Sequence, residues 1–328
     1  MEWKNAIQKE LLQLRDKLKS NFQRIELKKK ELDKRRPLPE VAINRIKEDL
    51  YIEWSYNSNS IEGNTLNLNE TRIVLQEGMT VKGKSLKEHL EITNHHDAIE
   101  FVEELAKKKQ KITEKNILNI HEIVMLKIEK LHAGCYRNGA VRIVGANFIP
   151  PNPLKVSILM EELMEYIETN PLKLNDIEMA ASLHHRFVWI HPFFDGNGRT
   201  IRLIMNLFLM QKGYPPAIIL KNDRKKYYEA LNQANNGSYH KLILLIAQSI
   251  ERSLDIYLMP HPGNNYDYMP ITAIIEEEQL PYGQEYISLL ARQGKIDAFK
   301  EGRNWYTSKK AVNDYLNNRK RKRTVSKK

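Results

Sequence analysis

The sequence predicts a mainly α-helical protein with a small separate domain at its C-terminal end, and three observations support this prediction. Apolar residues recur at helical spacing over long stretches, as they do at Ile7, Leu11, Leu14 and Leu18. Several stretches open with a capping residue followed three positions later by Glu, a pairing that satisfies free N–H groups at a helix start. Residues 259–270 carry three Pro, one Gly and two Asn, which is typical of a linker, and beyond them the pattern changes.

The N-terminal region, residues 1–99, is expected to form long helices. The first continues the apolar stripe to about Arg36 and stops before Pro37. We expect this helix to pack against the core, and a coiled coil or homodimer contact is the alternative. The second helix spans roughly residues 39–62, after which Gly63 is a natural stop.

Further helices are expected along the chain. The capping pairs that mark their starts are Asn67 with Glu70, Ser85 with Glu88, and Asn175 with Glu178. Helical spacing also fits residues 114–127, 154–168, 224–233 and 239–258. One stretch departs from this pattern, because Val141–Val144 alternates weakly and Pro150 and Pro151 follow soon after. We expect a short β-hairpin, or flap, at Val141–Asn147.

Composition narrows the class of protein. No apolar run approaches the roughly 18 residues that a membrane span needs, so no membrane partner is expected. The first residues lack the charged-then-apolar pattern of a signal peptide. The single cysteine, Cys135, rules out an internal disulfide framework. These features predict a cytoplasmic protein. The net charge of +11 suggests polyanionic partners such as nucleotides or nucleic acid.

The residues from His191 to Arg202 carry the clearest chemical pattern. The helix before them must end near Ile190, because Pro192 removes a backbone donor and restricts its predecessor. A new helix follows, and its start lies close to Asn197. A helix start offers free N–H groups and a positive dipole end, which together suit a phosphate.

The side chains around this helix start fit phosphoryl-type transfer. Gly196 and Gly198 let the backbone approach an anion closely. Arg199 and Arg202 are three positions apart and can clamp phosphate oxygens from one helix face. Asp195 is a hard oxygen ligand for Mg²⁺. His191 is the candidate general base.

Each of these residues also has a structural interpretation. The run Asp195–Gly198 resembles a hairpin turn, but its flanks have helical spacing. The arginines alone could be solvated surface residues, and His191 could be a helix-terminal histidine with a structural hydrogen bond. The structural interpretation requires a separate explanation for each of these residues within one run of twelve, so a single functional interpretation is favoured.

This run resembles the signature of the Fic family, in which His, Phe, an acid, Gly-Asn-Gly and two arginines stand at fixed spacing. Every defined position matches, including Phe193. The resemblance extends over roughly residues 100–255, and Gly134–Arg137, Val141–Ile143 and Pro150–Pro151 look like the family's flap region.

The resemblance implies a fold and a set of roles. The fold would be a helical bundle core with a short β-hairpin flap. His191 would activate a target hydroxyl, Asp195 would bind Mg²⁺, and the phosphates of ATP would be held by the remaining signature residues: Gly196, Asn197, Gly198, Arg199 and Arg202. The product would be a target protein carrying AMP on a Ser, Thr or Tyr hydroxyl. Family members with Lys at the second glycine act differently, and Gly198 favours AMP transfer.

A second Fic-like element lies upstream. Ser58, Glu62 and Gly63 match the pattern by which some family members inhibit themselves. The resemblance implies that the Glu62 carboxylate pairs with Arg202 and keeps that arginine from the terminal phosphate of ATP. The structural alternative is an ordinary helix end with an exposed Glu and a glycine cap.

Two histidine pairs receive structural interpretations. His184 lies on the apolar face of its helix, where a hydrogen-bonded core histidine is more common than a ligand, and with His185 and His191 it lacks the further ligands that zinc requires. His95 and His96 are interpreted as a surface or packing pair.

The segment 271–328 is expected to form a separate domain after a core at 100–258 and the linker at 259–270. Residues 271–318 resemble a winged helix-turn-helix, with helices at 271–278 and 283–292, a hairpin with Gly302 in its turn, and a closing helix at 308–316. From residue 271 onward there are 13 Lys or Arg against 7 Asp or Glu. That charge suits DNA, and a protein-binding domain with a solvated basic tail is the alternative.

For the whole protein, the leading hypothesis is a Fic-type adenylyltransferase that uses ATP and Mg²⁺. The alternative is a DNA-binding regulator whose core only senses nucleotide.

Overall fold

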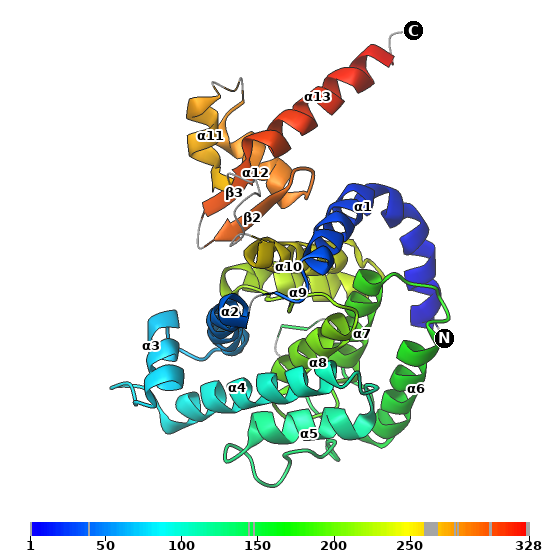
Figure 1. Cartoon of the computed structure of the whole chain (residues 1–328). Helices are drawn as coiled ribbons and strands as arrows, with labels where there is room; N and C mark the ends of the chain where they lie inside the picture. The colour runs from blue at the N-terminus through cyan, green and yellow to red at the C-terminus, as the bar shows by residue number, and fades with distance from the viewer. Residues whose placement is uncertain are drawn as a thin grey trace.

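The computed structural model describes residues 2–38, 40–143, 145–146, 148–258, 268–278, 280, 282–301 and 304–325, and most of them are helical (Figure 1). The helices of the larger part are α1 (Glu2–Lys34), α2 (Glu40–Ile61), α3 (Leu68–Arg72), α4 (Leu86–Lys107), α5 (Glu114–Met125), α6 (Val156–Thr169), α7 (Asp176–Ile190), α8 (Asn197–Gln211), α9 (Arg224–Asn235) and α10 (His240–Leu258). Three shorter helical segments are the π-helix η1 (Ile73–Glu77) and the 3₁₀-helices η2 (Pro153–Lys155) and η3 (Lys221–Asp223). The mainly α prediction is confirmed. None of these described helices is apolar over a length that would cross a bilayer.

The central helix is α8, which packs against α2, α4, α5 and α7 (Figure 1). Its residues from Arg199 to Leu209 are all buried, including the polar side chains of Thr200 and Asn206. A helix that is buried on every side must satisfy its polar groups inside the protein. Asn206 does so by exchanging two hydrogen bonds with the backbone of Ala217, at 2.7 and 3.1 Å.

Capping residues start the helices where the sequence predicts. Asn67, Ser85 and Asn175 each accept a bond from the backbone three residues later, and the Glu at that position bonds back to the cap. These reciprocal bonds satisfy N–H groups that an α-helix leaves free at its start.

The first helix packs along α10, as expected for a packing helix. Leu18, Ile25 and Leu32 are buried in the main core. The side chains of Ile7, Leu11 and Leu14 lie outside the part that the structure describes. The homodimer alternative stays a prediction.

The hairpin expected at Val141–Asn147 is wrong for the described residues of that segment. Residues 141–143, 145 and 146 belong to no strand, and a turn joins the Ile143 carbonyl to the Ala146 N–H at 3.2 Å. Val144 and Asn147 lie outside the described residues. A lone two-stranded hairpin without a third strand is marginal, so weak alternation is poor evidence for one.

The C-terminal part forms a small sheet with three helices. The strands β1 (Tyr268–Pro270), β2 (Ala298–Glu301) and β3 (Asn304–Ser308) pair antiparallel in the order β1-β3-β2. The helices are α11 (Ile271–Glu277), α12 (Gln284–Arg292) and α13 (Lys309–Val325), and α13 projects away from the rest of the molecule (Figure 1). The two predicted helices and the hairpin are present. The sequence missed β1, which occupies the end of the expected linker, whereas residues 259–267 and Gly302 lie outside the described residues.

A buried charge cluster joins this part to the larger one. The Lys28 ammonium lies 2.7 Å from Asp255 Oδ1 on α10, 2.6 Å from Asp297 Oδ1 ahead of β2, and 3.3 Å from Glu251 Oε1. Arg24 adds a two-pronged contact to Glu251, with both N–O distances 2.9 Å. One lysine therefore connects α1, α10 and the C-terminal sheet.

We expect Lys28→Met to destabilise the protein by about 3–5 kcal/mol, because it removes the cation that contacts the Asp255 and Asp297 carboxylates, whereas Glu251 keeps its contact with Arg24. The measurement is urea unfolding at neutral pH. Lys30→Met is the matched control, since Lys30 is an exposed lysine on the same helix. Equal stability of the two variants would contradict the proposed importance of the cluster.

Candidate active site

The end of α7 fixes the position of His191. This residue adopts a left-handed conformation, with φ 50° and ψ 62°, and its N–H still bonds to the Phe187 carbonyl at 2.9 Å. Pro192 follows and prevents the helix from continuing. The chain therefore turns sharply, as predicted, and the imidazole begins the loop that leads into α8.

The loop is held by two reciprocal hydrogen bonds. Asn197 accepts from the Phe193 N–H at 2.9 Å and donates to the Phe193 carbonyl at 2.8 Å. Phe193 is fully buried and stacks on His121 of α5 with centroids 3.6 Å apart. Asn197 and Phe193 thus fix the loop backbone rather than lying free in solvent.

His121 is a support that the sequence analysis missed. Its Nδ1 accepts from the Gly134 N–H at 3.0 Å, so its Nε2 carries the proton and donates to the Asp195 carbonyl at 3.1 Å. Burial lowers the pKa of His121 to about 4, so it keeps this neutral form. A single histidine on an apolar helix face gives no local sign of such a role.

Two glycines shape the start of α8. Gly196 caps the helix with φ 75°. At Gly198 an added Cβ would lie 2.1 Å from Glu62 Oε1, so only glycine fits this position while Glu62 is in place. The Glu62 carboxylate therefore lies against the first turn of α8, whose N–H groups have no partner within the helix.

Two buried arginines flank this helix start. Arg199 Nη1 lies 3.3 Å from Glu91 Oε1, and its Nη2 lies 3.5 Å from Asp195 Oδ1. Among the described residues, Arg199 Nε and Arg202 Nη1 have no hydrogen-bond partner, and Arg199 Nη1 has only its ion pair with Glu91. Buried guanidinium donors without acceptors are costly, and a bound phosphate would supply acceptors.

Asp195 lies at the open side of the loop. Its side chain is 54% exposed, and its Oδ1 accepts from the Gly196 N–H at 2.6 Å. The carboxylate is therefore oriented by the backbone yet accessible to a cation from solvent.

The end of α2 reaches into this site. Arg202 donates from Nε to Ser58 Oγ at 3.0 Å and from Nη2 to the Ser58 carbonyl at 2.8 Å. The same Nη2 lies 2.8 Å from Glu62 Oε1. Gly63 follows with φ 107°, a conformation that favours glycine, and the chain leaves the site there.

Residues from η3 and α9 hold the end of α2 in place. Arg224 Nε donates to the Ile61 carbonyl at 2.7 Å, and Tyr228 does so at 3.4 Å. Asn57 accepts from the Lys221 N–H at 2.7 Å. Carbonyls at a helix end need such partners, and these contacts position Ser58 and Glu62 against Arg202.

Arg137 holds the segment before the motif against it. Its guanidinium donates to the carbonyls of His191 at 2.8 Å, Pro151 at 2.7 Å and Gly139 at 3.0 Å. The region that resembles the family's flap is therefore attached directly to the backbone of the candidate base.

Comparisons with known proteins agree with this geometry. A family model described as the Fic/DOC family matches residues 111–209. A solved structure of Fic-1 from C. elegans is 31% identical, covers 73% of this chain and 72% of that chain, and superposes with a TM-score of 0.65.

This chain belongs to the Fic family. The curated relatives include proteins named protein adenylyltransferase Fic: that of Aedes aegypti is 37% identical over 269 residues, which are 80% of this chain and 52% of the relative. That of Nematostella vectensis is 40% identical over 224 residues, 68% of this chain and 52% of the relative. The chain thus spans about half the length of the curated relatives it matches.

The two histidine pairs noted in the sequence of this Fic family chain have structural surroundings. His184 bonds to the Tyr227 hydroxyl at 2.7 Å, and His185 bonds to Asn235 and to the Tyr239 hydroxyl. Burial lowers the pKa of His184 to about 3 and that of His185 to about 4. The interpretation of His184 as a hydrogen-bonded core histidine is confirmed.

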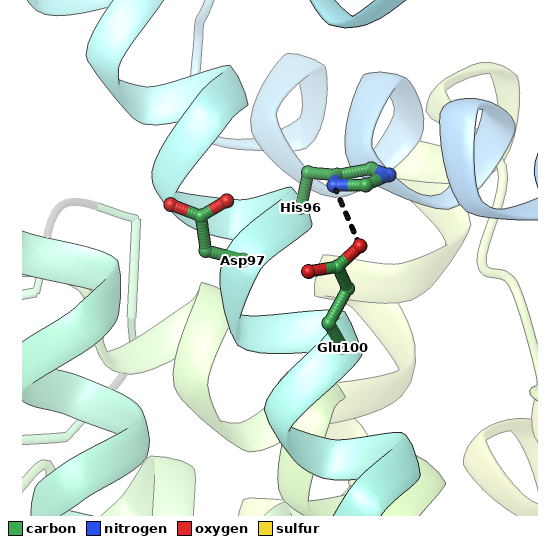
Figure 2. Close-up of side chains that lie close together, drawn as sticks. All are labelled: His96, Asp97 and Glu100. Carbon is green, nitrogen blue, oxygen red and sulfur yellow. Dashed lines mark ion pairs between the residues drawn. The ribbon is translucent and has the colours of Figure 1, made fainter.

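The other pair is divided between core and surface. His95 is fully buried against Trp54. His96 points to the outside of α4, where it lies with Asp97 and Glu100 on one helix face, and its Nδ1 is 4.0 Å from Glu100 Oε1 (Figure 2). Since all three come from one exposed stretch of helix, this group is interpreted as surface charge.

The pKa of His191 tests whether its imidazole is buried in solution as it is in the structure. Burial, with a smaller contribution from the charge of Arg137, lowers the pKa of His191 to about 4, although the Val188 backbone, Glu62 and Asp195 act in the opposite direction. The ring is therefore neutral above this value and ready to accept a proton at pH 7. We expect its NMR titration midpoint near pH 4. A midpoint near the ordinary value of about 6.5 would contradict its burial.

Proposed function

We propose that this chain is a protein adenylyltransferase, which transfers AMP from ATP to a Ser, Thr or Tyr hydroxyl of a target protein. The observation that carries the proposal is the juxtaposition of a neutral His191 with a helix start flanked by two buried arginines that have unused donors. The adenylyltransferase names of the relatives support it.

The anion surface fits the phosphates of ATP. Gly196, Asn197 and Gly198 present the first backbone N–H groups of α8, while Arg199 and Arg202 offer guanidinium donors from the same helix. These groups would neutralise the phosphate charge and align the nucleotide.

Asp195 fits Mg²⁺ by its chemistry, because it is an accessible carboxylate beside the phosphate surface. Mg²⁺ is usually held by one or two carboxylates together with substrate phosphates. When bound, it would offset negative charge on the phosphates.

His191 would act as the base. It takes the proton of the target hydroxyl, and the oxygen then forms a bond to the α-phosphorus. The bond between the α-phosphorus and its bridging oxygen breaks, and diphosphate leaves with that electron pair. Proton removal by a positioned base contributes about 10²–10⁴-fold to such reactions.

Ser58, Glu62 and Gly63 would form an inhibitory element. The Glu62 carboxylate lies over Gly198 and pairs with Arg202. In this arrangement it competes with the terminal phosphate of ATP for the same arginine and for the same space.

The division of the chain into residues 1–99, 100–258, 259–270 and 271–328 is also proposed. The C-terminal helices and strands have their own apolar cluster, which supports a separate domain. A cytoplasmic location is proposed on the single cysteine, Cys135.

DNA binding by the C-terminal domain is a separate proposal, supported by its charge of +6 and by its order of helices and hairpin. We expect the full chain to bind a labelled duplex with an affinity that falls as salt rises. Replacement of Arg319, Arg321 and Arg323 by Ser should weaken binding, whereas Lys225→Ser on α9 should not. Equal binding by both variants would mean that the basic tail serves another partner.

The proposed activity is tested by incubating Glu62→Gly, which lacks the inhibitory carboxylate, with ATP and Mg²⁺ and measuring the intact masses of the chain and of added lysate proteins. We expect the addition of AMP to the chain itself or to an added lysate protein. The alternative regulator, which only senses nucleotide, would bind ATP and show no covalent product.

A further inference from the structure

A cavity of about 690 Å³ lies away from the phosphate surface, where the connection from α1 to α2 meets the far end of α8. Its wall is shared by α2, through Ile43, Lys47 and Tyr51, and by α4, through Glu103 and Lys107. Its volume is typical of a small-molecule site, which usually spans about 300–1,000 Å³.

The cavity wall is apolar and aromatic over most of its surface. The rings of Tyr51, Tyr214 and Tyr257 line it, together with Met210 and the prolines at 37, 215 and 216. Burial raises the pKa of Tyr257 to about 12, and burial together with the charge of Glu103 raises the pKa of Tyr51. The three phenols are therefore neutral donors on an apolar wall, which suits a ring or a short alkyl chain.

Cations outnumber acids among the described lining residues. Arg36, Lys47 and Lys107 line the cavity with one carboxylate, Glu103. Glu103 pairs with Lys47, and it lies 3.2 Å from the Lys107 ammonium. Burial would raise the pKa of Glu103, but Lys47 outweighs this and the pKa lies below its ordinary value, so the group is ionised. A ligand carboxylate or sulfonate would find two ammonium groups that share a single acid.

We propose that this cavity binds a small amphiphilic anion, with its apolar body against the tyrosines and its charge at Lys47 and Lys107. A ligand that touches α2 through Tyr51 and α8 through Met210 binds the arrangement of these two helices seen here and so favours it. Because α2 carries Glu62 at its other end and α8 carries Arg202, occupancy holds the inhibitory contact in place. This second step rests on the proposed function.

The binding step is tested without any enzyme assay. The probe is anilinonaphthalenesulfonate, an aromatic anion that becomes fluorescent in apolar surroundings, titrated into the full chain. Ala106→Phe, which fills the cavity, should abolish saturable binding. An uncharged phenylnaphthylamine should bind more weakly than the anion.

Two single charge-removing substitutions are expected to change the affinity for the probe in opposite directions. Glu103→Gln frees both lysines and should tighten probe binding about threefold, whereas Lys107→Gln should weaken it about twofold. Lys108→Gln is the matched control, because Lys108 is the exposed neighbour that pairs with Glu104 instead. Saturable binding that ignores Ala106→Phe, or equal effects of the two charge variants, would overturn the site.

The coupling step compares AMP transfer with and without the probe. We expect the probe to slow self-modification of the wild type and to leave Glu62→Gly unaffected, since the effect passes through Glu62. Equal slowing of both, or no slowing of either, would overturn the coupling. If Glu62→Gly transfers no AMP under any condition, the proposed function fails, while the fluorescence titration still judges the cavity.

Discussion

Glu62→Gly is expected to increase the initial rate of AMP transfer by about 10²-fold, because a reacting group displaced by about 1 Å can cost that much. In the structure the Glu62 carboxylate lies 2.8 Å from Arg202 Nη2 and occupies the space above Gly198. Removing it frees both the arginine and the backbone surface for the terminal phosphate. Self-modification with labelled ATP is the measurement.

Three further variants show whether the gain comes from this contact. Glu62→Gln keeps the bulk without the charge and should give an intermediate rate. Glu62→Gly combined with Arg202→Ala should lose the gain. Glu77→Gly is the matched control, since Glu77 also precedes a glycine with positive φ, Gly78. A rate in Glu62→Gly that equals or falls below the wild-type rate would leave Glu62 as an ordinary helix-end residue.

His191→Ala in the Glu62→Gly background is expected to lower AMP transfer by about 10²–10⁴-fold through loss of the base. ATP affinity should stay unchanged, because the helix start and both arginines remain. Initial rates and calorimetric titration with ATP measure the two effects separately.

The backbone at His191 calls for a second variant. Its φ of 50° is left-handed, where Asn is better tolerated than Ala. His191→Asn should therefore fold like the wild type and be as inactive as His191→Ala. Transfer at the undiminished rate in both variants would exclude His191 as the base.

The sequence predicted much of the site because its signals are local. Pro192 ends one helix, Gly196 caps the next, and the apolar spacing on either side is helical rather than alternating. The approach of Ser58 and Glu62 to Arg202, more than 100 residues away in the chain, came from family resemblance, since nothing in the intervening spacing encodes it.

The contacts that support the site could not be predicted from the sequence because they depend on tertiary packing. The stacking of His121 on Phe193, the pairing of Glu91 with Arg199 and the bond from Arg224 to the end of α2 each join separate elements. The predicted hairpin failed because weak alternation near Val141 is poor evidence for two strands that no third strand supports.

Two properties are proposed for this chain: it transfers AMP, and Glu62 restrains that transfer. One labelling experiment tests both. The wild type and Glu62→Gly are each incubated with Mg²⁺ and with ATP labelled at either the α- or the γ-phosphate, and the initial rates at which label becomes protein-bound are compared; the rate from the α-phosphate should be higher in Glu62→Gly. The account predicts label on protein from the α-phosphate and none from the γ-phosphate, because diphosphate leaves. Protein-bound γ-label, or no label from either position, would contradict it.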